Sequence, residues 1–254
     1  MKITILVVLS AISFMSFSQE KIVDERTGIE IIFSAEGNIF PDSWLSTTID
    51  AKGISLDPEE YSRSKTVILQ ALLKYPIAVI KKNLKRIYIL KEIEFYGKTF
   101  GGTNSTDIVY LSQNGTKNGY SNFYFEQLFH AEFSSILLRN YPQYFDKTNW
   151  LKNNSSEFSY GDGGVNALKK NLSSERFDAK INEMGLINQY ATSSMENDFN
   201  SFAKNLFLPK FGFSELIDKY ALLKNKRALI IAFYGKIDSS FSEDFFDKIL
   251  HPTE

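Results

Sequence analysis

The chain has 254 residues, of which 43% are hydrophobic and 15% aromatic, so it can bury a substantial core in one large globular domain or two small ones. Its 29 lysines and arginines nearly balance 30 aspartates and glutamates, which leaves no basic surface to attract nucleic acid. It has no cysteine and only two histidines, His130 and His251, which excludes disulfides, thiolate nucleophiles and cysteine-ligated metals. Any imidazole in a catalytic or metal site must come from one of these two residues.

The N-terminal residues 1–18 predict a secretory signal peptide. One lysine precedes an apolar run from Ile3 to Phe14, and the small residues Ser16 and Ser18 stand before Gln19. The run is short for a membrane span, and no later stretch is long and apolar enough to cross a bilayer. No cysteine follows it, which excludes a lipobox. We therefore expect a secreted or periplasmic mature chain without a membrane span, and a single N-terminal anchor is the alternative.

The first half of the mature chain predicts a small β-sheet and two helices. Residues 29–33, 86–90 and 107–111 are rich in β-branched residues and indicate strands, and the alternation in the third favours an edge of the sheet. Asp57 and Pro58 indicate a helix start, with Asp57 as the cap. Pro76 predicts a break, and a second helical segment follows it.

The second half predicts mostly helices. One begins near Ser121, and after a connection over residues 142–164 we expect helical segments around Ala167 and over 175–184, 195–208, 214–223 and 241–250. No linker is long or polar enough to divide the chain. The order of elements predicts a single α+β domain over residues 19–254, mostly helical with a small N-terminal β-sheet.

The stretch FEQLFHAEFSSILLRNY, residues 125–141, is apolar around most of its circumference, which predicts a central, buried helix. Its polar residues are informative, because a buried charge is costly unless it is paired or bound to a metal. They form two groups at helical spacing on nearly opposite faces, one with Glu126, His130 and Ser134 and the other with Glu132, Ser135 and Arg139.

FHAEFSSIL, together with YATSSMENDFNSFAKNLF over residues 190–207, resembles the two motif helices of a family of gluzincin-like zinc metallopeptidases in secreted bacterial proteins. In that family a helix with His-Glu-x-x-His supplies two zinc ligands and the catalytic glutamate, and a later helix supplies a glutamate as third ligand. The resemblance extends from about Leu72 to Tyr234, through FGGTNSTDIVYL and FSYGDGG. It implies a zincin-like domain, a zinc cofactor, and a peptide or protein substrate or ligand.

The ligand positions depart from the family pattern, so the motif is degenerate. If Glu132 takes the place of the catalytic glutamate, the two histidine positions are occupied by Ala131 and Ser135. If His130 takes the place of the first ligand, the glutamate position is Ala131 and the second ligand is Ser134. Neither register yields His-Glu-x-x-His, and a conventional two-histidine zinc site is not expected.

The candidate site residues therefore have two interpretations each. Glu132 is the candidate catalytic carboxylate, or it forms a buried network with Arg139. His130 is a candidate metal ligand in an unconventional site with Glu126 and a carboxylate from Glu196 or Asp198, or it is a hydrogen-bonded core histidine. The resemblance places Glu196 nearest to the third zinc ligand, whereas the local pattern explains it as an acid in the first turn of a helix capped by Ser193 or Ser194.

Two functions remain open. One is a secreted or periplasmic protein resembling zinc metallopeptidases, whose Ala131 and Ser135 argue against hydrolytic activity. The other is a non-enzymatic peptide- or glycan-binding or scaffold protein, a pseudoenzyme that retains the peptidase fold. An enzyme needs Glu132 or another carboxylate in the cleft beside a metal, whereas a binding protein can leave that place apolar or ion-paired.

Overall fold

The computed structural model describes residues 20–251, so the signal peptide predicted over residues 1–18 lies outside the described residues. The described residues form a seven-stranded mixed sheet followed by a largely helical part. The strands are β1 (Lys21–Val23), β2 (Glu30–Ile32), β3 (Lys52–Ser55), β4 (Arg86–Phe95), β5 (Lys98–Phe100), β6 (Gly102–Asn104) and β7 (Ile108–Ser112). The helices are α1 (Tyr61–Leu73), α2 (Ile77–Asn83), α3 (Asn122–Asn140), α4 (Lys147–Lys152), α5 (Gly164–Lys169), α6 (Ala179–Glu183), α7 (Met195–Phe207), α8 (Phe213–Lys219), α9 (Ala221–Ile237) and α10 (Glu243–Leu250).

Strand β4 organises the sheet. Its first half pairs in parallel with β2 and β7, and its second half pairs antiparallel with β3 and β5. Strands β1 and β6 complete the order β1-β2-β4-β7-β6 as antiparallel partners of β2 and β7. The prediction that β7 is an edge strand was wrong, because β6 covers its outer side and residues 109–112 are buried.

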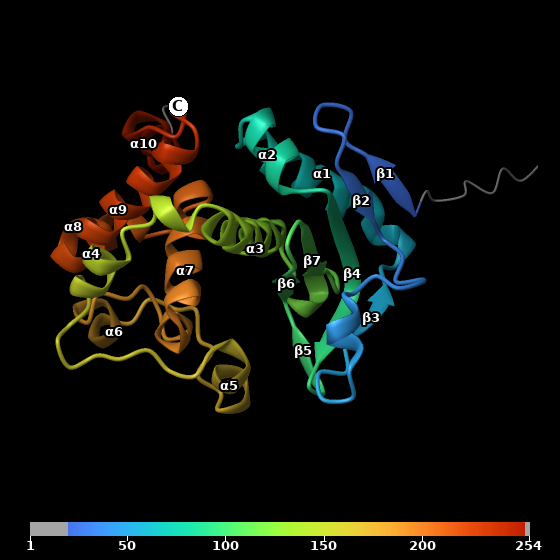
Figure 1. The fold of residues 1–254 in the computed structure, drawn as a ribbon, viewed down its shortest axis with the longest axis horizontal. Helices are drawn as coiled ribbons and strands as arrows, with labels where there is room; N and C mark the ends of the chain where they lie inside the picture. Colours follow the sequence, from blue (N-terminus) through green and yellow to red (C-terminus); the bar gives the residue numbers. More distant parts are fainter. Residues whose placement is uncertain (1–19, 252–254) are drawn as a thin grey trace, which may run out of the picture.

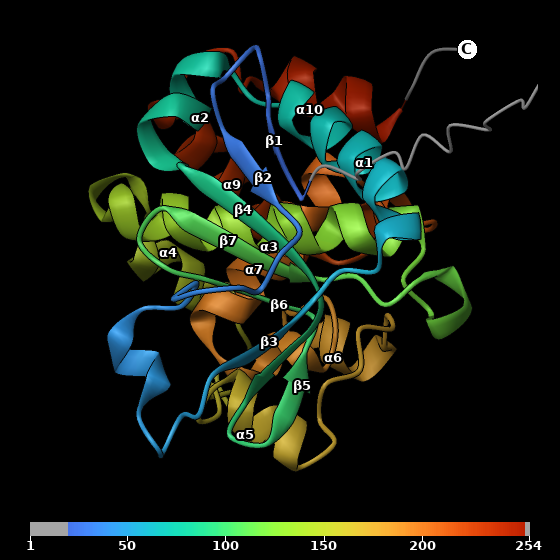
Figure 2. The ribbon, with the colours of Figure 1, turned by 90° about the vertical axis from the view of Figure 1, so that its right-hand side faces the viewer.

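Helix α3 lies between the sheet and the C-terminal helices, as two perpendicular views show (Figures 1 and 2). Its first turn is capped by Ser121, whose hydroxyl accepts a hydrogen bond from the backbone N–H of Tyr124 at 3.1 Å. The fully buried Phe125, Phe129 and Phe133 of α3 belong to a core that also takes side chains from α1, β4, β7 and α7. The predicted central, buried helix is confirmed.

A second, smaller core covers the sheet face that is remote from α3. It contains Phe40, Tyr88, Phe95 and Tyr110, and Trp44 from the 3₁₀ helix Asp42–Leu45 packs against it. The ring centroids of Tyr88 and Tyr110 lie 5.3 Å apart on neighbouring strands. Both faces of the central strands are therefore buried, as the apolar run Ile87–Leu90 of β4 requires.

Several predicted elements have different limits in the structure. The break at Pro76 is confirmed, but Asp57 gives no side-chain cap and instead pairs with Lys91 at 2.9 Å. The helix predicted over 175–184 is limited to α6, because Phe177 forms an isolated antiparallel bridge with Asn188. The 17-residue helix α9 was not predicted beyond residue 223. Among the helices of residues 20–251, none has the length and hydrophobicity that crossing a bilayer requires.

Candidate functional site

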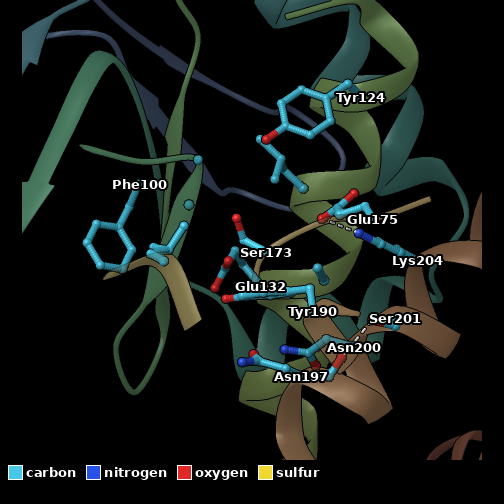
Figure 3. Close-up of a pocket in the computed structure, with 15 residues that line it drawn as sticks. Phe100, Tyr124, Glu132, Ser173, Glu175, Tyr190, Asn197, Asn200, Ser201 and Lys204 are labelled. Atoms are coloured by element: carbon cyan, nitrogen blue, oxygen red, sulfur yellow. Dashed lines mark hydrogen bonds and ion pairs between the residues drawn. The ribbon is translucent and has the colours of Figure 1, made fainter. Parts of the chain in front are cut away.

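A cleft of about 350 Å³ lies where α3 and α7 meet the turn between β5 and β6 (Figure 3). Helix α3 contributes Ala131 and Glu132 to its lining, and α7 contributes Asn197, Asn200 and Lys204. The turn contributes Gly101, β6 contributes Gly102, and the wall of the cleft also includes the aromatic side chains of Phe100, Tyr124 and Tyr190. The cleft thus combines aromatic walls with a polar floor supplied by two helices.

Glu132 is the carboxylate at the centre of this lining. A Cβ atom on Gly102 would lie 3.0 Å from both Cγ and Oε1 of Glu132, so any larger residue at this position would displace the Glu132 side chain by a few tenths of an ångström. Asn104 Nδ2 donates a hydrogen bond to Glu132 Oε2 at 2.5 Å, and Oε1 accepts none from the described residues. Burial raises the pKa of Glu132 to about 7, and the nearby Glu196 carboxylate adds to the rise.

Arg139 and Glu132 share Asn104 as a hydrogen-bond partner. Arg139 donates to Asn104 Oδ1, and it also donates to the backbone carbonyl of Ser105 at 2.7 Å. Its guanidinium pairs with Glu196 at 3.3 Å, and the Glu196 side chain is 45% exposed. Glu196 is therefore a partly exposed partner of Arg139 in the first turn of α7, which Ser194 caps.

His130 lies in the aromatic core. It is fully buried, its Nδ1 is 2.8 Å from the hydroxyl of Tyr75, and its Nε2 is 3.3 Å from Glu126 Oε1. Its ring stacks on Phe207 with centroids 5.1 Å apart, and Glu126 is also paired with Lys74 at 2.6 Å. Burial lowers the pKa of His130 to about 4, which keeps the imidazole neutral. Its contacts are those of a hydrogen-bonded core histidine.

Asn200 of α7 connects to both serines that follow Glu132 on α3. Its Nδ2 donates to Ser135 Oγ at 2.7 Å, and its Oδ1 accepts from Ser134 Oγ at 2.6 Å. These bonds join α3 to α7 directly beside Glu132. The side chains around Glu132 at i−1, at i+3 and on the facing helix are thus Ala131, Ser135 and Asn200.

This donor set does not fit zinc. Structural and catalytic zinc sites use at least three imidazole, thiolate or carboxylate ligands. Within residues 20–251, no group of three or more histidine, cysteine, aspartate or glutamate side chains is arranged to hold a metal ion. The predicted metal residues have separate neighbours, because His130 contacts Tyr75 and Glu126 whereas Glu196 contacts Arg139.

Asp198 is committed to a buried ion pair. Its Oδ2 lies 2.7 Å from Lys226 Nζ, and both side chains are 0% exposed. The same oxygen accepts hydrogen bonds from Trp150 Nε1 at 2.9 Å and from the hydroxyl of Tyr160 at 2.6 Å. Asp198 thus joins α4, α7 and α9 in the core and is not available to a metal beside His130.

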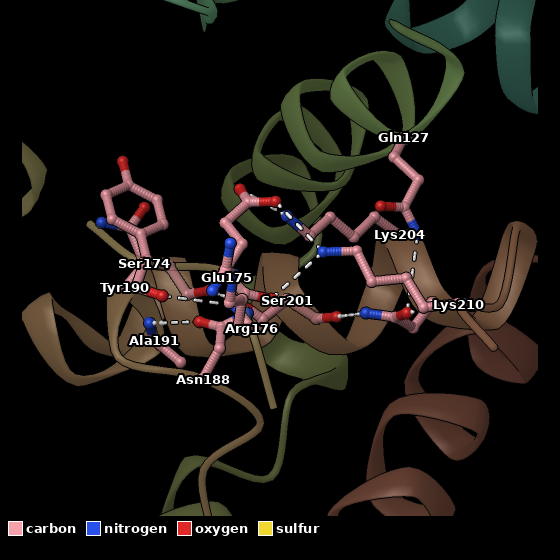
Figure 4. Close-up of polar contacts among 12 residues, drawn as sticks. Gln127, Ser174, Glu175, Arg176, Asn188, Tyr190, Ala191, Ser201, Lys204 and Lys210 are labelled. Atoms are coloured by element: carbon pink, nitrogen blue, oxygen red, sulfur yellow. Dashed lines mark hydrogen bonds and ion pairs between the residues drawn. The ribbon is translucent and has the colours of Figure 1, made fainter. Parts of the chain in front are cut away.

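A second charged group of the cleft was not predicted from the sequence. Lys204 Nζ lies 2.7 Å from Glu175 Oε1, and Lys210 Nζ lies 3.3 Å from Glu175 Oε2 (Figure 4). Burial raises the pKa of Glu175, but the two lysines outweigh this effect and the pKa is lowered overall. The three residues come from segments that only the tertiary structure brings together, so no local sequence pattern marks them.

The sheet, the central helix α3 and the second cleft helix α7 define a mixed α/β protein. The fold is similar to that of a solved structure described as a putative zinc-binding metallo-peptidase from Bacteroides caccae, with a TM-score of 0.56 and 15% sequence identity. The similarity covers 89% of this chain and 85% of that chain. No protein-family model and no curated protein matches the chain. The similarity therefore concerns the fold, and the function has to be argued from the cleft.

Proposed function

We propose that this chain is a secreted or periplasmic pseudoenzyme, a binding protein that holds a peptide in the cleft of a metallopeptidase-like fold without hydrolysing it. The observation that carries the proposal is the set of side chains around Glu132. The carboxylate faces a cleft, but Ala131, Ser135 and Asn200 occupy the positions beside it. None of these three is an ordinary zinc ligand.

Binding is supported by the polar groups of the cleft. Asn197, Asn200, Tyr124 and Tyr190 offer amide and hydroxyl groups, and Glu132 Oε1 has no hydrogen-bond donor among the described residues. Such groups match the N–H and C=O groups of a peptide backbone. Sites of this kind fix a ligand through a few directed hydrogen bonds between apolar walls.

The absence of zinc ligands removes the chemical task of a catalytic glutamate. In the zinc peptidases that the sequence resembles, the glutamate takes a proton from water that zinc has activated. Beside Ala131 and Ser135 the carboxyl group of Glu132 has no such neighbour, and it is held by Asn104 instead. In this chain Glu132 then serves as a hydrogen-bonding group for the ligand.

The metal content of the mature protein, residues 19 onward, tests this proposal. Wild type and an Ala131→His/Ser135→His/Asn200→Glu variant are dialysed against zinc, and the bound metal is measured by elemental mass spectrometry. We expect no stoichiometric zinc in the wild type, and about one zinc per chain in the variant, which gains two imidazoles at i and i+4 and a carboxylate. The variant shows that the assay detects zinc held at this place.

A His130→Ala variant and a peptide-library cleavage assay complete the test. Stoichiometric zinc in the wild type that is lost in His130→Ala would overturn the proposal and indicate an unconventional metal site. Cleavage of library peptides by the wild type, lost in Glu132→Gln, would also overturn it. We expect no zinc that depends on His130, because its ring is enclosed by Tyr75, Phe129 and Phe207. We expect no cleavage, because Ala131 and Ser135 are not zinc ligands.

A further inference from the structure

An apolar hollow of about 150 Å³ lies beside the cleft, next to the β5–β6 turn. Its lining includes the aromatic residues Trp44, Phe95, Tyr96 and Phe100, together with Thr103 of β6 and Val165 of α5. Trp44 and Phe95 stand edge to face with ring centroids 5.4 Å apart. The hollow opens beside the small core on the sheet face remote from α3.

The hollow and the cleft are neighbours across the same edge of the sheet. Phe100 lines both of them. Helix α5 also borders both, because Val165 lines the hollow and Leu168, three residues later, lines the cleft. Between them run Gly101 and Gly102, the first residue of β6, and neither carries a side chain. One ligand can therefore contact both places by crossing this edge.

The two places differ in what they can bind. Among the described residues that line the hollow, only Thr103 and Tyr96 carry a side-chain hydroxyl group. A sugar ring there would find few hydrogen-bond partners on the protein, whereas an apolar side chain needs none. A cavity of about 150 Å³ is large enough to hold benzene, so an aromatic or branched aliphatic side chain fits.

The cleft has one carboxyl oxygen open to a hydrogen-bond donor. The oxygens of Glu175 are engaged by Lys204 and Lys210, at 2.7 and 3.3 Å. Glu132 has one oxygen that accepts no hydrogen bond from the described residues. The group that the cleft offers to a ligand is therefore a carboxyl oxygen, which accepts from an amide N–H or an ammonium group.

We propose that the hollow and the cleft form one two-part site for an extended peptide. An aromatic or branched apolar side chain enters the hollow, and an amide or ammonium group of the same peptide donates to Glu132. This inference rests on the proposed function, and it adds which side chain the peptide must carry and where that side chain is bound. A peptide fits because it supplies an apolar side chain and backbone amides on one chain.

A resin-bound hexapeptide library with all positions randomised tests the inference on the mature protein. We expect the resin-bound peptides that retain the protein to be enriched in Phe, Tyr, Leu or Ile at one position. The enriched peptide and the same peptide with alanine at that position are then titrated against the protein, with tryptophan fluorescence as readout. The chain has two tryptophans, and Trp150 is fully buried, so Trp44 is the one that reports on the hollow.

The enriched peptide should change the Trp44 signal and bind about tenfold or more tightly than its alanine counterpart, since the buried side chain provides the difference. In the protein, Val165→Arg should weaken binding to a similar extent. Val23→Arg is the matched control, because Val23 is 53% exposed in β1 at the opposite end of the strand order. We expect it to bind the peptide as the wild type does.

The outcomes separate the two proposals. If peptides bind, and Glu132→Gln or Asn200→Ala weakens binding while Val165→Arg and the alanine peptide do not, the two-part site is wrong and the proposed function stands. If no peptide is retained, both are overturned. Binding to a glycan array without retention of any peptide would also overturn both, because the occupant would then be a sugar.

Discussion

Replacing Glu132 with glutamine should stabilise the protein at alkaline pH and have little effect at acid pH. Burial raises the pKa of this carboxyl group from its ordinary 4.5 to about 7. The folded state therefore holds the proton more tightly than the unfolded state does. This contribution to stability is fully present below pH 4.5 and is lost as the pH rises through 7. Glutamine has the same shape and carries no charge at any pH.

The size of the effect follows from the difference between the two pKa values. A rise from 4.5 to about 7 corresponds to at most about 3 kcal/mol at pH 8. Because Glu132 lines an open cleft, water screens part of this cost. We expect Glu132→Gln to raise the free energy of unfolding by about 1–2 kcal/mol at pH 8, and by less than about 0.5 kcal/mol at pH 4.5.

Urea denaturation of both proteins at pH 4.5 and pH 8 measures these differences. The comparison with wild type at each pH cancels the titration of other groups, including His130, whose lowered pKa destabilises the fold towards acid pH. Glu157→Gln, at an exposed position outside the cleft, is the matched control for replacing a glutamate with glutamine. An equal effect of Glu132→Gln at both pH values would refute the argument that the cleft favours the neutral carboxyl group.

Three further substitutions have effects that the structure predicts. Lys226→Met should lower the free energy of unfolding, measured by urea denaturation, by about 3–5 kcal/mol, because it leaves Asp198 buried without its cation. Adding Asp198→Asn to the same chain should restore part of this stability. If it restores none, the pairing is contradicted. His130→Ala should lower the free energy of unfolding by about 2–4 kcal/mol, since it opens a cavity and leaves the Tyr75 hydroxyl without its partner. A variant as stable as the wild type would show that the core does not depend on this contact. Asn200→Ala should lower stability by about 1–3 kcal/mol by removing its bonds to two serine hydroxyl groups of α3, and an unchanged melting temperature would contradict that role.

Much of the fold could be predicted from local patterns. The apolar circumference of residues 125–141 predicts the buried helix α3, and Pro76 predicts the break between α1 and α2. The short strands β5 and β6 escaped prediction because each has three residues, too few to show a period. The prediction that β7 is an edge strand was wrong because its outer neighbour, β6, was itself not predicted.

The candidate site was predictable only in part. The sequence singles out Glu132, and in the structure this residue lines the cleft. The sequence also suggests a network of Glu132 with Arg139, and in the structure Asn104 is hydrogen-bonded to both side chains. For His130 the open alternative of a core histidine describes its contacts. The metal-ligand alternative has Glu126 nearby but no third ligand among residues 20–251, since Glu196 pairs with Arg139 and Asp198 with Lys226.

The sequence by itself determined which chemistry is available, because the absence of cysteine and the presence of only two histidines limit metal and nucleophilic sites before any folding is considered. It also determined α3 and several other helices, since a period of 3.6 residues is a local property. Only the tertiary structure decided which side of α3 faces the cleft, that Asn200 bonds to Ser134 and Ser135, and that Glu175 meets Lys204 and Lys210. These contacts join residues that are distant along the chain, and their geometry depends on how helices pack, which no local pattern specifies.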